Sequence, residues 1–169
     1  MARQTIKCAA PDAFDKRQQA AFIELVKSGG EVAERTLTRN VPQAERLAFL
    51  WLDDALCGVA ALKNPQSSYR EGFLKKSGVA VEGRAFPFEL GYVFITKPAQ
   101  GRGYSRKLVE ALLADYRHDG IFTTSHTTNE AMHKTLARYG FERAGKPWNG
   151  KDSGEMIQLF LRRGEQSSC

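Results

Sequence analysis

The chain has 169 residues, of which 42% are hydrophobic and 26% charged, and 25 Lys and Arg against 19 Asp and Glu give a formal net charge of +6. These values are typical of one globular domain with an ordinary core, and they argue against a disordered chain, a coiled coil and a disulfide scaffold. No apolar stretch approaches the roughly 20 residues of a membrane helix, and the polar N-terminus lacks the core of a signal peptide, so we expect a soluble cytoplasmic protein without membrane attachment.

The first 45 residues are expected to form a short strand at residues 3–8 and two helices. Pro11-Asp12 is typical of a helix start and Gly29-Gly30 of a helix end. The apolar residues of this helix recur on one face; they are Phe14, Ala21, Phe22, Leu25 and Val26. A second short helix is expected within residues 31–45.

A hairpin is expected next, with strands at Arg46–Leu52 and Leu56–Leu62 joined by a turn at Asp53-Asp54. Residues 64–88 then form a polar insertion, in which Tyr69–Lys76 has room for one or two helical turns. The insertion mixes basic and aromatic side chains, which suits an anionic acceptor. The simpler interpretation is a solvated loop whose aromatic side chains dock on the core.

Strands and helices alternate in the second half of the chain. The expected elements are a strand at Phe86–Ile95, a helix at Gly103–Tyr116, a strand at Ile121–Ser125, a helix at Asn129–Tyr139, and strands at Phe141–Ala144 and Met156–Leu161. Crossover helices between strands imply at least one parallel pair. We therefore expect a mixed α+β fold: a mostly antiparallel sheet of about six or seven strands with one parallel pair, flanked by about four helices. The whole chain is expected to be one domain, with residues 164–169 as a tail.

A glycine-containing loop, Gln100-Gly101-Arg102-Gly103-Tyr104-Ser105, joins an expected strand to an expected helix. Its glycines allow backbone N–H groups to approach a ligand, and a helix N-terminus favours a phosphate. Residues 97–107 carry four basic side chains and no acidic one, which also favours an anion. The spacing is not that of a P-loop, and a lone Gly-x-Gly is weak evidence for a dinucleotide site. A tight turn on a basic surface is the alternative.

The same loop resembles the acetyl-coenzyme A (acetyl-CoA) loop of the GNAT superfamily of N-acetyltransferases, whose pattern is Arg/Gln-x-x-Gly-x-Gly/Ala; here Ser105 takes the last position. Glu89-Leu90-Gly91-Tyr92-Val93 is similar to the strand before that loop. The segment from Asn129 to Gly145 resembles a second family element. In this sequence Ala131 lies one position earlier than the alanine of the family pattern. The resemblance covers about residues 46–163 and implies a GNAT fold whose parallel strand pair lies at the acetyl-CoA site.

The resemblance implies a role for each matching residue. The loop N–H groups would hold the coenzyme A (CoA) pyrophosphate, and the strand end would pair with the pantetheine arm and polarise the thioester carbonyl. Asn129 would bind the pantetheine or phosphate side. The implied cofactor-binding residues are Val93, Phe94, Ile95, Gln100, Gly101, Arg102, Gly103, Tyr104, Ser105, Arg106 and Asn129. No metal is expected.

An alkyl amine has a pKa of about 10 and must lose a proton before it attacks a thioester, so a general base is useful. Family members often place this base on the strand that holds Glu89, which makes Glu89 the first candidate; a surface carboxylate is the alternative. The tyrosine that usually protonates the departing thiolate would fall at Leu136, which cannot donate a proton. His133, one turn after Asn129, and His126 are candidate acids instead, as is water.

The resemblance therefore predicts an enzyme that moves the acetyl group of acetyl-CoA to a primary amine by direct attack on the thioester. The acceptor is an unidentified small molecule or protein, nucleic acid is less favoured, and a homodimer is one option. Two alternatives stay open. One is a GNAT-like module that binds CoA or nucleic acid with little catalysis, and the other is a toxin-like acetyltransferase acting on aminoacyl-tRNA.

Overall fold

The computed structural model describes residues 1–151 and 154–166, so the end of the expected tail, residues 167–169, lies outside the described residues. The chain divides into two compact units. Unit 1 comprises Met1–Asn64 with Leu90–Asp115, and unit 2 comprises Pro65–Glu89 with Tyr116–Cys169.

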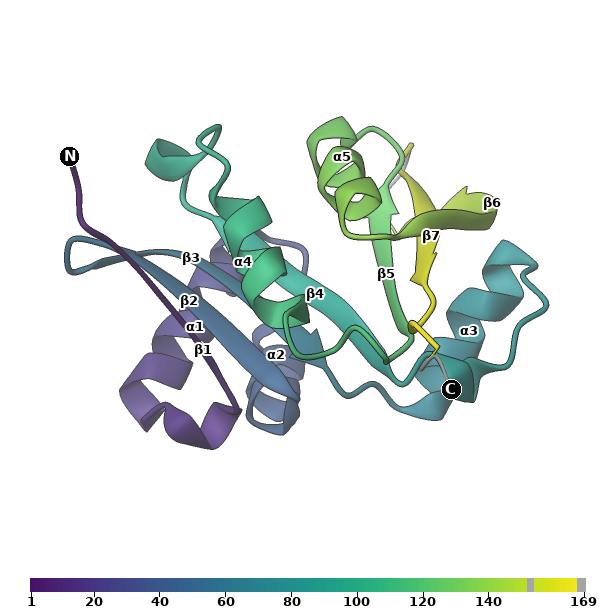
Figure 1. The fold of residues 1–169 in the computed structure, drawn as a ribbon, viewed down its shortest axis with the longest axis horizontal. Coiled ribbons are helices and arrows are strands. Elements are labelled where there is room, and N and C mark those ends of the chain that lie inside the picture. The colour runs from purple at the N-terminus through teal and green to yellow at the C-terminus, as the bar shows by residue number, and fades with distance from the viewer. Residues whose placement is uncertain (152–153, 167–169) are drawn as a thin grey trace. The chain divides into compact units, whose positions relative to one another are not determined.

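The described residues contain seven strands and five α-helices, whose chain order follows the predicted one (Figure 1). The strands are β1 (Gln4–Ala9), β2 (Arg46–Leu52), β3 (Ala55–Lys63), β4 (Phe88–Ile95), β5 (Ile121–His126), β6 (Glu142–Asn149) and β7 (Met156–Arg162). The helices are α1 (Lys16–Ser28), α2 (Glu34–Asn40), α3 (Ser67–Ser77), α4 (Tyr104–Leu113) and α5 (Glu130–Arg138). None of the described helices combines the length and the apolar character that a membrane span requires.

Strand β4 belongs to both units, because Phe88 and Glu89 fall in unit 2 and Leu90–Ile95 in unit 1. The strand order is β1-β2-β3-β4 in unit 1 and β4-β5-β7-β6 in unit 2. β4 and β5 are parallel, with Phe88 opposite Ile121 and Glu89 opposite Phe122. The pairs β1–β2, β2–β3, β5–β7 and β6–β7 are antiparallel. The predicted mixed sheet with one parallel pair is confirmed.

Unit 1 buries its core on both faces of its strands. The face toward α1 and α2 carries Leu47, Phe49, Val59 and Ala61, which cluster with Phe22 and Leu37. The other face meets α4, since a Cβ built on Gly58 would lie 3.2 Å from a methyl carbon of Leu108. Because side chains alternate across a strand, α1 and α2 cover one face of β2 and β3 and α4 covers the other (Figure 1).

Unit 2 is built in the same way. Helix α3 packs against β6 and β7, and its Leu74 joins a cluster with Phe86, Phe122, Leu159 and Leu161. Helix α5 lies over the opposite face, where the rings of His133 and Phe160 are 4.9 Å apart between centroids. Part of the insertion thus forms helix α3, which explains why the described residues contain five α-helices rather than about four.

The start of α1 differs from the prediction. The helix begins at Lys16 and not at Pro11, because Asp15 and Gln18 form a capping box. The Asp15 carboxylate accepts from the Gln18 backbone N–H at 2.8 Å, and the Gln18 side chain accepts from the Asp15 N–H at 3.0 Å. Pro11–Ala13 form a single 3-10 turn instead, and Ala21, expected on the buried face, is exposed.

Two further boundaries differ from the prediction by three residues or more. Helix α4 ends at Leu113 rather than at Tyr116. Strand β6 continues past Ala144 to Asn149 through a bulge. Buried Gln158 on β7 supports this bulge, since its side-chain nitrogen donates to the carbonyl of Ala144 at 3.0 Å. A side chain that satisfies backbone groups across a bulge is not visible in local sequence patterns.

Candidate functional site

The predicted site residues fall in both units. Val93–Ile95 and Gln100–Arg106 belong to unit 1, and Glu89, His126, Asn129 and His133 belong to unit 2.

The loop between β4 and α4 is held in shape by its own residues. The Gln100 side chain donates from Nε2 to the carbonyl of Ile95 at 3.0 Å, which ties the loop to the end of β4. Gly101 and Gly103 have φ angles of 77° and 79°, in the left-handed region that glycine adopts without cost. Gly103 directly precedes α4, so the helix begins at the residue that follows the second glycine of the loop.

The loop presents unused backbone donors. In the described part of the chain, no residue accepts a hydrogen bond from the N–H groups of residues 101–106. A Cβ built on Gly101 or Gly103 meets no atom within 4 Å, so the space beside them is open. The first N–H groups of a helix lack partners and carry partial positive charge. This arrangement suits a phosphate or another anion.

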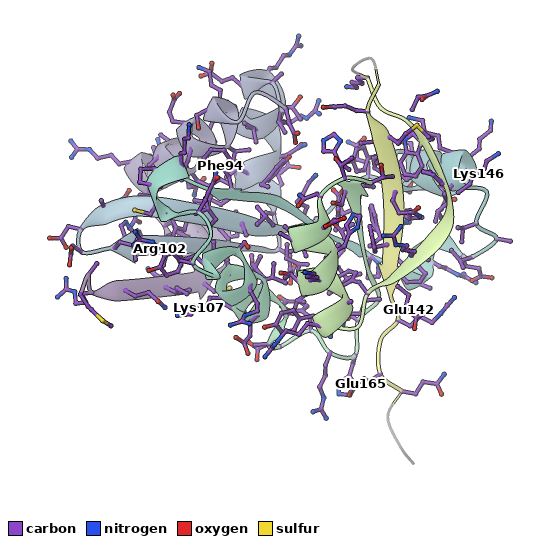
Figure 2. The ribbon with its side chains drawn as sticks, turned by 90° about the horizontal axis from the view of Figure 1, so that it is seen from above. Phe94, Arg102, Lys107, Glu142, Lys146 and Glu165 are labelled. Atoms are coloured by element: carbon purple, nitrogen blue, oxygen red, sulfur yellow. The ribbon has the colours of Figure 1, made fainter. Side chains whose placement is uncertain are left out.

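Basic side chains add to this positive character. Arg102 and Arg106 are exposed, and Figure 2 shows Arg102 and Lys107 near the start of α4. Lys107 is partly committed, because its ammonium donates to the Gln4 side chain at 2.8 Å and lies 5.7 Å from the centroid of the Tyr104 ring. The two arginines are therefore the better partners for a bound anion.

The end of β4 is irregular. Phe94 lies at the C-terminal end of α1 (Figure 2), where its ring is 3.0 Å from the position of a Cβ built on Gly29. Ile95 is buried. Tyr92 has a φ of 54°, which is rare for a residue other than glycine and costs free energy. The strand is thus distorted next to Val93, the first residue expected to contact the pantetheine arm.

Glu89 is buried, with only 3% of its surface exposed, so it is not a surface carboxylate. The hydroxyl of Tyr69 on α3 donates to its Oε2 at 3.1 Å. Tyr69 itself is 44% exposed. Buried carboxylates are uncommon unless they are paired or functional. Sequence reasoning missed Tyr69 as a site residue, and its only signal was the aromatic content of the insertion.

The ring of His133 is held by hydrogen bonds, and the ring of His126 lies beside a carboxylate. His133 Nδ1 lies 3.1 Å from the Arg143 guanidinium, which can only donate, so Nδ1 is the acceptor of this hydrogen bond. Its Nε2 then donates to the carbonyl of His126 at 2.9 Å. The His126 ring lies 3.7 Å from the Glu155 carboxylate. Because both ring nitrogens of His133 are engaged, these contacts do not favour it as a proton donor.

Asn129 and Leu136 have structural roles in α5. The Asn129 side-chain oxygen accepts from the Met132 N–H at 3.2 Å and caps the helix. Leu136 is 1% exposed and belongs to the core. Among the described residues, no three His, Cys, Asp or Glu side chains are grouped as metal ligands.

A comparison with models of protein families gives a match over most of the chain. The model of the acetyltransferase (GNAT) family matches residues 12–141. A comparison with curated protein sequences gave no significant match.

Solved structures share the fold at low sequence identity. The yncA protein of Salmonella typhimurium, solved with its cofactor acetyl-CoA, has a TM-score of 0.69 at 18% identity, over 99% of this chain and 98% of that one. Escherichia coli ElaA has a TM-score of 0.66 at 11% identity, over 95% and 100%. An acyl-CoA N-acyltransferase from Pseudomonas aeruginosa has 0.65 at 15% identity, over 95% and 99%.

Proposed function

The chain belongs to the GNAT acetyltransferase family, and we propose that it moves the acetyl group of acetyl-CoA to a primary amine by direct attack on the thioester. The observation that carries the proposal is the loop before α4. It combines two left-handed glycines, six N–H groups without a described acceptor at residues 101–106, and open space beside both glycines.

The loop fits the pyrophosphate of CoA. Its N–H groups can donate to phosphate oxygens, and Arg102 and Arg106 are exposed to neutralise charge. We assign Val93–Ile95 to the pantetheine arm and Gln100–Arg106 to the pyrophosphate, with Asn129 as a further cofactor contact. When bound, acetyl-CoA supplies the activated thioester.

Glu89 is the proposed general base. The protonated amine gives one proton to the Glu89 carboxylate, and its neutral nitrogen then forms a bond to the acetyl carbon. The nitrogen loses its second proton to water as the carbon–sulfur bond breaks. The departing thiolate takes a proton from His126 or from water, because Leu136 cannot supply one and the ring nitrogens of His133 are engaged. A buried carboxylate suits the role of base, since water does not compete for it.

The proposal is tested by incubating the purified protein with acetyl-CoA and a fixed panel of primary amines: tyramine, spermidine, lysine, glucosamine and a lysine peptide. Free CoA thiol is followed with a thiol reagent, and acetylated products are identified by mass spectrometry. We expect thiol release that depends on both the protein and one or more amines. Binding of acetyl-CoA without amine-dependent release would contradict the proposal and favour a binding module.

A further inference from the structure

Helix α3 brings an exposed tyrosine onto a buried carboxylate. We propose that Tyr69 is a positioning residue for Glu89, which holds the carboxylate in the orientation that proton abstraction requires. This inference rests on the proposed function and names the group that controls its base.

The contact joins a buried side chain to one that is exposed to solvent. Glu89 is 3% exposed, and the hydroxyl of Tyr69, whose residue is 44% exposed, donates to its Oε2 at 3.1 Å. Tyr69 and Met1 are the two large hydrophobic residues classed as exposed in the described ranges, residues 1–151 and 154–166. A tyrosine hydroxyl that leaves solvent usually finds a hydrogen-bond partner, and here that partner is a buried carboxylate on the strand next to the proposed site.

The ring of Tyr69 is fixed by its neighbours. It packs edge-on against Phe73, one turn further along α3, with 4.7 Å between the ring centroids. Phe73 in turn lies 5.8 Å from Trp148 on β6 and 6.2 Å from Phe122 on β5. The direction of the hydroxyl is therefore set by a continuous aromatic cluster within unit 2.

Helix α3 is itself anchored. Leu74 is buried in the unit 2 cluster, and the carbonyl of Ser77 at the end of the helix lies against Gly145 on β6 so closely that a Cβ there would overlap it. Gly145 has a φ of 67°, so glycine is favoured there by conformation as well as by space. The insertion thus presents Tyr69 from a rigid helix and not from a mobile loop.

The hydrogen bond from Tyr69 helps the Glu89 carboxylate to act as a base. A general base must lie within hydrogen-bond reach of the proton that it removes. A hydroxyl that donates to one carboxylate oxygen restricts the rotation of the group and so fixes where its lone pairs point. A phenylalanine at residue 69 would keep the ring contacts and remove this hydrogen bond alone.

The test compares Tyr69→Phe with a matched control, Tyr139→Phe, which removes a phenolic hydroxyl from the end of α5 in the same unit. The probe is the primary amine of the panel with the fastest acetyl-CoA-dependent turnover. For Tyr69→Phe we expect kcat/KM to fall about tenfold, chiefly in kcat, as for the loss of a hydrogen bond to a charged group. Tyr139→Phe should match the wild type.

A double-mutant cycle separates positioning from a merely structural effect. If Tyr69 acts through Glu89, adding Tyr69→Phe to Glu89→Gln should change kcat/KM by less than about twofold. The inference is overturned, with the proposed function intact, if Tyr69→Phe keeps wild-type activity, if its loss lies only in KM, or if the full loss persists beside Glu89→Gln. No turnover of any amine by the wild type overturns both. Thermal melting of each variant checks that its fold is retained.

Discussion

Replacing Gly103 with glutamate tests the pyrophosphate loop. Gly103 has a φ of 79° and stands immediately before α4. A Cβ at this position meets no atom within 4 Å, so the new side chain finds room and the fold is retained. Its carboxylate would occupy the open space where we place the pyrophosphate.

The cost to stability comes from the backbone alone. A residue other than glycine in the left-handed region costs about 1–2 kcal/mol. For a chain of this size each kcal/mol lowers Tm by about 2–4 °C, so we expect Tm to fall by about 2–8 °C.

The cost to binding is electrostatic and steric. Two like charges about 4 Å apart repel by about 4 kcal/mol at an effective dielectric constant of 20. Solvent and salt screen part of this at an exposed loop, so we expect the Kd for acetyl-CoA to rise about a hundredfold.

The assay is calorimetric titration with acetyl-CoA, supported by thermal melting. The matched control is Gly78→Glu, because Gly78 has a φ of 75° and the same free space but ends α3 in unit 2. Gly78→Glu should lose more stability than Gly103→Glu, because its carboxylate stands at the negative end of a helix, and only Gly103→Glu should lose binding. Gly103→Ala should keep most of the affinity, since it adds strain without charge. A wild-type Kd for Gly103→Glu, or an equal loss in Gly78→Glu, would refute the assignment of the loop.

Four other outcomes are expected. Glu89→Gln should lower kcat/KM about a hundredfold near pH 7, and the deficit should shrink toward pH 10 as the amine becomes neutral; a parallel profile would remove Glu89 as base. Leu136→Tyr should lower the free energy of unfolding by about 1–3 kcal/mol through overpacking, without raising kcat, as urea melts and turnover would show. Gly145→Ala should cost about 2–4 kcal/mol, because its Cβ overlaps the Ser77 carbonyl and its φ is positive; a wild-type Tm would refute this. Burial raises the pKa of the Cys8 thiol, so mass spectrometry should show iodoacetamide modifying it more slowly at pH 8 than it modifies glutathione.

Local patterns predicted much of the fold and the loop. The limits of β2 are those predicted, Arg46–Leu52, because a run of Leu, Phe and Trp residues between polar segments is typical of a buried strand. The Gln100–Ser105 loop was found because its glycines and the following helix are neighbours in sequence. α1 was misplaced because the Asp15–Gln18 capping box competes with the more obvious proline signal.

Contacts between distant residues could not be predicted. Tyr69 and Glu89 are 20 positions apart, and their meeting depends on how α3 packs on β6. His133 looked available in sequence, but its nitrogens are engaged by Arg143 and by the His126 carbonyl. Its role as an acid stays a prediction that these contacts do not favour.

Initial-velocity kinetics test the central claim most directly. Acetyl-CoA is varied at several fixed concentrations of the best amine, and CoA thiol release is recorded. Direct attack on the thioester requires both substrates to be bound together, so the account predicts double-reciprocal lines that intersect. Parallel lines with an acetylated protein seen by intact mass would indicate a covalent intermediate. That result, or the absence of amine-dependent release, would contradict the account.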